Sequence, residues 1–153
     1  MFKLISKTLA AVAMVSVALF GSANAKTLKI ETHFTASSPN GEVAAQFAKN
    51  VEMFSGGSLK IEMFYSSSVT GKSAEVFNSA QTGIIDCDMT GAGYQTGKNA
   101  AFQFAGDVMG GYDNPYQQYE FLNFPGAQEA VDALYNKYGM TLIGWWIPGH
   151  ESL

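Results

Sequence analysis

The amino-acid sequence predicts an α/β fold built on a parallel β-sheet. Residues 27–33, 59–65 and 84–90 have the pattern of strands, and the segments between them repeat apolar residues at helical spacing. A strand, a helix and a second strand in this order form a right-handed crossover that places the two strands parallel. Two such units in succession predict a sheet with the first strand between the other two.

The first strand shows the two-residue alternation most clearly. Leu28 and Ile30 share one face of the strand, and Lys29 and Glu31 share the other. The helix that follows is expected to begin after Ser38, since Ser is a preferred N-cap and a Pro stands at the first helical position. Its apolar residues recur at helical spacing: Val43, Phe47, Val51 and Phe54.

The second crossover joins the strand at residues 59–65 to the strand at residues 84–90. Residues 72–81 between them carry apolar side chains at helical spacing, which predicts a helix. Gly83 follows as a typical C-terminal stop.

The later part of the chain is less regular. Residues 99–109 and 114–122 are expected to be helical, the second of them entered through an Asn-Pro pair. The clearest helix covers residues 127–138, where a stripe of apolar side chains runs up to Gly139. A fourth strand is predicted over residues 140–146.

Composition excludes several classes of protein. Of the 153 residues, 47% are apolar and 14% are charged, which is unlike a disordered chain. The formal net charge is −4, all nine basic residues are Lys, and no Arg occurs. A nucleic-acid-binding protein needs a basic surface, so nucleic acid is not an expected partner.

Residues 1–25 have the pattern of a secretory signal peptide. Lys3 and Lys7 precede the apolar run Leu9–Phe20, and the small residues that follow end in an Ala-x-Ala site at Ala25. The apolar run is shorter than the roughly 20 residues needed to cross a bilayer. The sequence therefore predicts a periplasmic protein with no stable membrane insertion after cleavage.

Ligand-binding residues are expected in the loops at the carboxyl ends of the strands, where open α/β sheets bind their ligands. Tyr94 offers a hydroxyl donor to a carboxylate or keto oxygen, and Trp146 offers an aromatic wall. His33 and His150 lie at strand ends, as ligand donors or as ordinary loop residues. Glu75 is expected to orient a donor or to accept from a ligand hydroxyl. The alternatives are that Glu75 caps a helix and that Trp146 packs in the core.

The motifs of nucleotide-binding and hydrolytic enzymes do not occur. Gly91–Lys98 lacks the first Gly and the final Ser or Thr of a phosphate-binding loop, and no Gly-x-Ser-x-Gly element marks a hydrolase. Asp86 and Asp88 fall on one strand face, either as a weak metal pair or as a polar strand face, and we favour the second. Cys87, the only cysteine, is expected to be a small buried residue. No metal and no cofactor is expected.

Three segments resemble the solute-binding proteins of tripartite ATP-independent periplasmic (TRAP) transporters, the dicarboxylate-binding (DctP) family. Gly71–Met89 is similar to the family's run from a Gly and a Glu, through a helix ending in Gly, to an Asp-containing strand. Tyr94–Phe102 resembles a segment of members that bind 2-oxo acids or related monocarboxylates, from which Asn99 and Ala100 depart. Gly144–Leu153 is similar to the segment that enters the second lobe.

The resemblance implies a periplasmic-binding-protein-like (type II) lobe with a parallel βαβαβ sheet, in a two-lobed protein that closes on its ligand. Residues 1–25 are then the signal peptide. Residues 26–153 are the first α/β lobe, truncated at the crossing to an incomplete second lobe. In this family an Arg of the second lobe, beyond Leu153, usually holds the ligand carboxylate.

The function implied by the resemblance is the capture of a small organic acid, namely a 2-oxo, hydroxy or dicarboxylic acid, in the periplasm. The ligand passes to the membrane permease subunits of a TRAP transporter, which an ion gradient drives. Such a protein is not an enzyme. The sequence leaves two alternatives open: a secreted α/β enzyme of unknown reaction and a purely structural, partner-binding protein.

Overall fold

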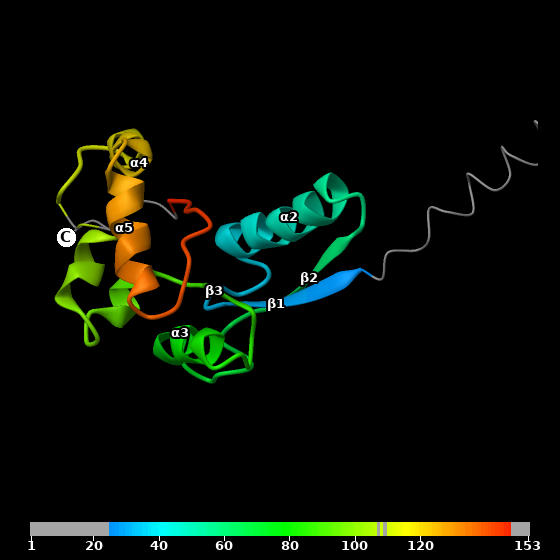
Figure 1. The fold of residues 1–153 in the computed structure, drawn as a ribbon. Helices are drawn as coiled ribbons and strands as arrows, with labels where there is room; N and C mark the ends of the chain where they lie inside the picture. Colours follow the sequence, from blue (N-terminus) through cyan, green and yellow to red (C-terminus); the bar gives the residue numbers. More distant parts are fainter. Residues whose placement is uncertain (1–24, 107, 109, 148–153) are drawn as a thin grey trace, which may run out of the picture.

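The computed structural model describes residues 25–106, 108 and 110–147. Residues 1–24 of the predicted signal peptide and the candidate ligand residue His150 lie outside this part of the chain. Within it, no helix has both the length and the apolar composition that crossing a membrane requires. Figure 1 shows a small sheet flanked by helices, followed by a helical part formed by the later half of the chain.

Three parallel strands form the sheet, in the order β2-β1-β3. β1 (Lys26–Thr32) lies in the centre and pairs with β2 (Leu59–Phe64) along most of its length. β3 (Cys87–Met89) pairs with the carboxyl-terminal end of β1 on the other side. The α/β fold, the parallel pairing and the strand order predicted from the sequence are confirmed.

The two crossover helices lie on opposite faces of the sheet (Figure 1), as two right-handed crossovers in opposite directions require. α2 (Pro39–Phe54) has the predicted cap, because the Ser38 side chain accepts a hydrogen bond from the Gly41 amide at 3.0 Å. Gly41 is required there, since a Cβ atom would lie 2.0 Å from the carbonyl oxygen of Thr35. α3 (Ser73–Gln81) agrees with the predicted range to one residue.

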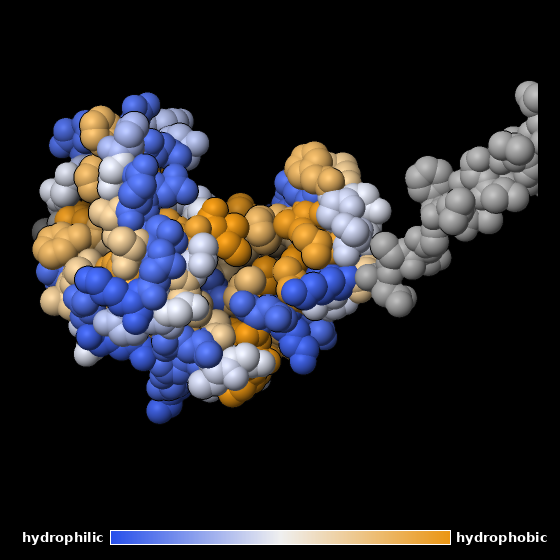
Figure 2. All heavy atoms as spheres, in the orientation of Figure 1, coloured by the Kyte–Doolittle hydropathy of each residue, from blue (hydrophilic) through white to orange (hydrophobic). Residues whose placement is uncertain are grey.

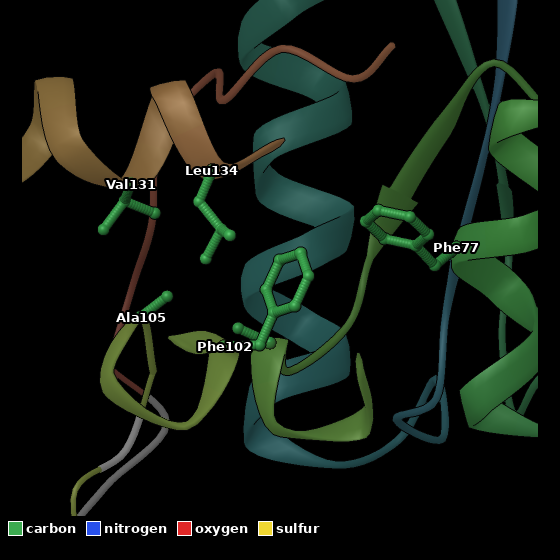
Figure 3. Packing of buried hydrophobic residues seen from close by; sticks show 6 residues of the cluster. Phe77, Phe102, Ala105, Val131 and Leu134 are labelled. Carbon is green, nitrogen blue, oxygen red and sulfur yellow. The ribbon is translucent and has the colours of Figure 1, made fainter. Parts of the chain in front are cut away.

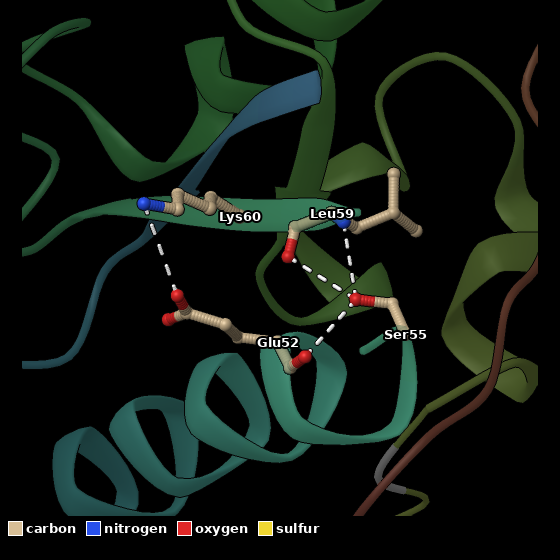
Figure 4. A network of polar contacts seen from close by, with 4 residues as sticks. All are labelled: Glu52, Ser55, Leu59 and Lys60. Atoms are coloured by element: carbon tan, nitrogen blue, oxygen red, sulfur yellow. Dashed lines mark hydrogen bonds and ion pairs between the residues drawn. The ribbon is translucent and has the colours of Figure 1, made fainter. Parts of the chain in front are cut away.

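The turn after α2 fixes the start of β2 (Figure 4). The Ser55 hydroxyl donates to the carbonyl of Glu52 at 3.1 Å and accepts from the amide of Leu59 at 3.1 Å. Lys60 and Glu52 add an ion pair at 4.0 Å, which is worth little at a solvent-exposed position. The hydroxyl of Ser55 therefore joins the end of the helix to the first residue of the strand.

β3 begins later than the sequence predicts. Ile84 and Ile85 belong instead to the turn after α3, where both amides donate to the carbonyl of Ser79, at 2.9 and 3.4 Å. The amide of Asp86 is the first to reach β1, donating to the carbonyl of Lys29 at 2.8 Å. Amides that are bound to the helix end are not free for a strand ladder, and this shortens the strand.

The later half of the chain consists of short helices. η1 (Ala92–Gln95) and η2 (Ala100–Phe104) are 3₁₀ helices, so the helix predicted over residues 99–109 is much shorter than expected. The poorer hydrogen-bond geometry of a 3₁₀ helix limits its length to a few residues. α4 (Pro115–Asn123) and α5 (Ala127–Asn136) agree with the predicted helices to within two residues.

The prediction of a fourth strand over residues 140–146 is wrong. A strand is stabilised by hydrogen bonds to a neighbouring strand, and among the described residues this segment has no such pairing. It returns instead to α5, where the Leu142 amide donates to the side chain of Asp132 at 2.8 Å. The segment also supplies partly buried side chains that pack against the core: Met140, Leu142 and Trp145.

The hydrophobic core joins the sheet to the later half of the chain (Figure 3). Phe77 of α3 and Phe102 of η2 are fully buried and meet edge to face, with ring centroids 5.8 Å apart. The centroids of Tyr135 and Tyr138 each lie between 5.2 and 5.9 Å from both Phe rings. We refer to these four residues as the aromatic core. It holds α3, η2 and the end of α5 together.

Two carboxylates lie side by side at the carboxyl ends of β1 and β3. Glu31, which the alternating pattern places on the polar face, is fully buried, and Asp88 is its register partner. One oxygen of Glu31 accepts from the amides of Val69 at 2.6 Å and Thr70 at 3.4 Å. Burial raises the pKa of Asp88 to about 6, and the charge of Glu31 adds to the rise. The raised pKa of Asp88 makes the stability of the fold sensitive to pH.

Because Phe102 is fully buried in the aromatic core, we predict that Phe102→Ala strongly destabilises the fold. We expect this change to lower the free energy of unfolding by about 3–5 kcal/mol, because it leaves a cavity in place of a buried ring. Phe104→Ala, on the same short helix, is the matched control. Phe104 is 61% exposed, so its removal should change the stability by less than about 0.5 kcal/mol. Urea denaturation measures both, and equal losses would contradict the assigned role of the aromatic core.

The raised pKa of Asp88 predicts that the free energy of unfolding falls as the pH rises. Its pKa is about 6 in the folded protein, against an ordinary value of 3.8. Between these values the folded chain keeps the proton and the unfolded chain has lost it, so folding becomes less favourable through this window. Asp88→Asn removes the effect. The free energy of unfolding of Asp88→Asn, relative to that of the wild type, should increase by about 3 kcal/mol between about pH 3.5 and about pH 7. Urea denaturation measures this difference.

The control for Asp88→Asn is Asp113→Asn, which removes the same charge at an exposed position. It corrects for the general effect of lowering the negative charge of the protein. A stability difference between Asp88→Asn and the wild type that stays constant with pH would contradict the prediction.

Candidate functional site

A pocket of about 680 Å³ lies at the carboxyl ends of β1 and β3. In the strand order β2-β1-β3, the chain passes from β1 to β2 on one side and then crosses back to β3 on the other, and ligands of open α/β sheets bind where the strand order reverses. Figure 2 shows a hollow between the α2 side and the α4–α5 side of the molecule, with apolar side chains gathered in it. The lining residues are His33, Phe34, Asn40, Met89, Thr90, Gly91, Ala92, Gly93, Tyr94, Ala105, Gly106, Gln118, Leu122, Tyr135, Leu142, Gly144, Trp145 and Trp146.

Four aromatic side chains form one side of this pocket, and we refer to them as the aromatic wall. His33 and Phe34, just after β1, have ring centroids 4.0 Å apart. The ring of Tyr94 in η1 meets the His33 ring edge to face at 5.3 Å. Trp146 lies 6.3 Å from Phe34. The wall therefore combines residues from the end of β1, from η1 and from the segment after α5.

The described residues that line the pocket carry no formal charge. None of them is Asp, Glu or Lys, and the whole sequence has no Arg. Burial lowers the pKa of His33 below its ordinary value of 6.5, which favours the neutral imidazole at pH 7. Burial also raises the pKa of Tyr135 to about 12, so its hydroxyl keeps its proton. An anion in this pocket finds neutral hydrogen-bonding groups and no cation among the lining residues.

Four lining residues have a buried polar atom without a hydrogen-bond partner in the described part of the chain. These atoms are His33 Nδ1, Thr90 Oγ1, Gln118 Oε1 and Trp146 Nε1. A buried polar atom that stays unpaired costs roughly 1–3 kcal/mol. Such atoms are therefore candidates for hydrogen bonds with a ligand.

The structure brings some of the residues predicted from the sequence to the pocket. Tyr94 and Trp146 line it, and so does Trp145, which also packs against the core. Glu75 is exposed on α3, where it accepts from the Asn78 side chain at 2.8 Å, and it does not line the pocket. His150 lies outside the described residues.

Gln118 is a pocket residue that the sequence did not single out. It is buried because its side chain reaches Gly106, a contact between α4 and the segment after η2 that no local pattern reveals. His33 was left open as a ligand donor or a loop residue, and the structure places it in the aromatic wall.

The acidic pair flanking Cys87 does not form the core of a larger metal-ligand cluster. Asp86 accepts from the backbone amide of Lys29 at 2.8 Å, and Asp88 lies beside Glu31. No three of the described His, Cys, Asp and Glu side chains come together as a possible metal site. Burial raises the pKa of Cys87, with the charges of Asp86 and Asp88 adding to the rise, so its thiol stays protonated.

Solved structures with this fold are periplasmic solute-binding proteins. A TRAP solute-binding protein from Rhodobacter sphaeroides, in an open form without ligand, is 27% identical with a TM-score of 0.75, over 81% of this chain and 39% of that chain. One from Pseudoalteromonas atlantica T6c, with bound sodium and pyruvate, is 20% identical with a TM-score of 0.69, over 76% of this chain and 35% of that chain. An extracytoplasmic solute receptor from Bordetella pertussis that binds pyroglutamic acid is 22% identical with a TM-score of 0.64, over 77% of this chain and 38% of that chain.

The chain thus spans less than two fifths of the length of each of these relatives. No curated protein matches the sequence. The family model for bacterial extracellular solute-binding proteins, family 7 (DctP), matches residues 30–153, which is most of the chain. The parallel sheet with its pocket and the match over these residues together establish that the chain belongs to the DctP family of bacterial extracellular solute-binding proteins.

Proposed function

We propose that this chain is the first lobe of a two-lobed TRAP solute-binding protein that captures a small organic acid. The observation that carries the proposal is the uncharged pocket with an aromatic wall at the carboxyl ends of β1 and β3, in a member of a solute-binding family. Its volume of about 680 Å³ is within the usual range for small-molecule sites. We refer to the protein with both lobes as the two-lobed protein.

The aromatic wall fits the chemistry of a small acid. The rings of Phe34 and Trp146 offer apolar contact to a short carbon skeleton. The Tyr94 hydroxyl and the Trp146 indole N–H are donors that suit carboxylate or keto oxygens. Related structures contain pyruvate, pyroglutamic acid or succinate, which supports a ligand of this class.

The negative charge of such a ligand needs a partner that the pocket lining does not supply. Neither Lys nor Arg occurs among the lining residues. We propose that a cationic side chain of the second lobe pairs with the ligand carboxylate when the lobes close. Closure also removes the ligand from water, which strengthens this pairing.

We propose binding without chemical conversion. The family consists of solute-binding proteins, and the neutral lining supports a binding role. The His33 imidazole contacts the rings of Phe34 and Tyr94, and its Nδ1 has no hydrogen-bond partner among the described residues that could orient it as a general base.

The location and the partner follow from the same proposal. The signal pattern of residues 1–25 and the family together support export to the periplasm. There the loaded protein would deliver its ligand to the membrane permease subunits of a TRAP transporter.

The proposal is tested by Tyr94→Phe in the two-lobed protein. Isothermal titration against 2-oxo, hydroxy and dicarboxylic acids first identifies a ligand and its Kd. The substitution keeps the ring that contacts His33 and removes only the hydroxyl. Loss of one hydrogen bond of about 1–2 kcal/mol should raise the Kd about 5- to 30-fold.

Tyr116→Phe is the matched control, because Tyr116 is 81% exposed on α4 and does not line the pocket. Its Kd should equal that of the wild type. Equal Kd values for all three proteins would remove Tyr94 from the site. Absence of binding to every acid in the panel would refute the proposed function.

A second prediction concerns the single lobe. Residues 26–153 alone should show no thermal stabilisation by acids that the two-lobed protein binds, because one wall of the site and the cation are missing. Thermal unfolding with and without each acid at millimolar concentration measures this. A clear upward shift of the Tm would contradict the requirement for two lobes.

A further inference from the structure

Gln118 has a fixed side-chain orientation in the pocket. It lies on α4 and is only 3% exposed. Its Nε2 donates to the carbonyl oxygen of Gly106 at 3.2 Å. A carbonyl oxygen only accepts, so the amide nitrogen must face Gly106 and the Oε1 atom must face away from it. Because Gln118 lines the pocket, its Oε1 is an acceptor group of the lining.

This acceptor has no partner in the described part of the chain. Gln118 Oε1 is buried and receives no hydrogen bond, although several donors line the same pocket, among them the Tyr94 hydroxyl and the Trp146 indole. A buried amide oxygen without a donor is costly, and a ligand that supplies a donor removes that cost. A ligand without a hydrogen-bond donor leaves the Gln118 oxygen unpaired and brings a second acceptor oxygen toward it.

We propose that Gln118 is a specificity residue that accepts a hydrogen bond from a ligand hydroxyl, so that the protein prefers hydroxy acids to 2-oxo acids with the same carbon skeleton. The inference rests on the proposed function and narrows its ligand class. A hydroxyl donates to the Gln118 oxygen, whereas a keto group offers only another acceptor. A site built around such a bond discriminates against the analogue that lacks the donor.

The test compares matched ligands in the two-lobed protein. L-lactate with pyruvate and 2-hydroxyglutarate with 2-oxoglutarate differ only in the hydroxyl or keto group. Isothermal titration should give a Kd about tenfold or more lower for the hydroxy acid of the pair that fits. Equal Kd values, or tighter binding of the 2-oxo acid, would overturn the inference without any variant being made.

Gln118→Met then locates the effect, since it keeps the length of the side chain and removes the acceptor. We expect it to weaken binding of the hydroxy acid about tenfold and to change binding of the 2-oxo acid less than about threefold. Gln117→Met, at the exposed neighbouring position on α4, is the control and should leave both Kd values unchanged. An unchanged preference in Gln118→Met would overturn the assignment to Gln118.

The proposed function and the role of Gln118 can be refuted separately. If the wild-type two-lobed protein binds none of the four acids or the wider panel, the proposed function is refuted and the inference falls with it. If the protein binds organic acids but shows no preference for the hydroxyl form, only the role of Gln118 is refuted.

Discussion

The fold depends on the packing of four aromatic rings between its two halves. Phe77 belongs to the sheet part, Phe102 to the short helices, and Tyr135 and Tyr138 to the end of α5 and the residues after it. This contact holds the end of α5 beside α3, and the segment after α5 reaches the pocket with Trp146. The aromatic core therefore contributes to the position of the later half of the chain beside the strand ends.

The pocket that results has an apolar and aromatic lining with a few polar atoms and no charge. In the proposed function, this lining would contact the carbon skeleton and the neutral oxygens of a small acid and leave its negative charge to the second lobe. Such a division predicts that a single lobe binds the acid poorly. In the proposed function, closure of the two lobes would bring a cation to the ligand and exclude water, and opening would release the ligand.

Local patterns were sufficient to predict the first two strands, both crossover helices and the strand order, because alternation and capping residues act within each segment. Local patterns failed where a contact between residues far apart in the sequence determines the structure. The fourth predicted strand has no neighbour to pair with in the described part, and Gln118 is buried only because Gly106 lies beside it. The rule that ligands bind at strand ends led to Tyr94, which follows β3 and lines the pocket. Trp146 also lines the pocket although the strand predicted before it does not form, whereas Glu75 lies on an exposed helix face outside the pocket.

The central claim is that the pocket at the carboxyl ends of β1 and β3 is one half of an organic-acid site. A crystal structure of the two-lobed protein with its bound acid tests this most directly. We expect the ligand to lie against the aromatic wall, within hydrogen-bond distance of Tyr94 or Trp146, with its carboxylate paired to a cation of the second lobe. A ligand bound away from this wall, or a pocket filled by side chains of the second lobe, would contradict it.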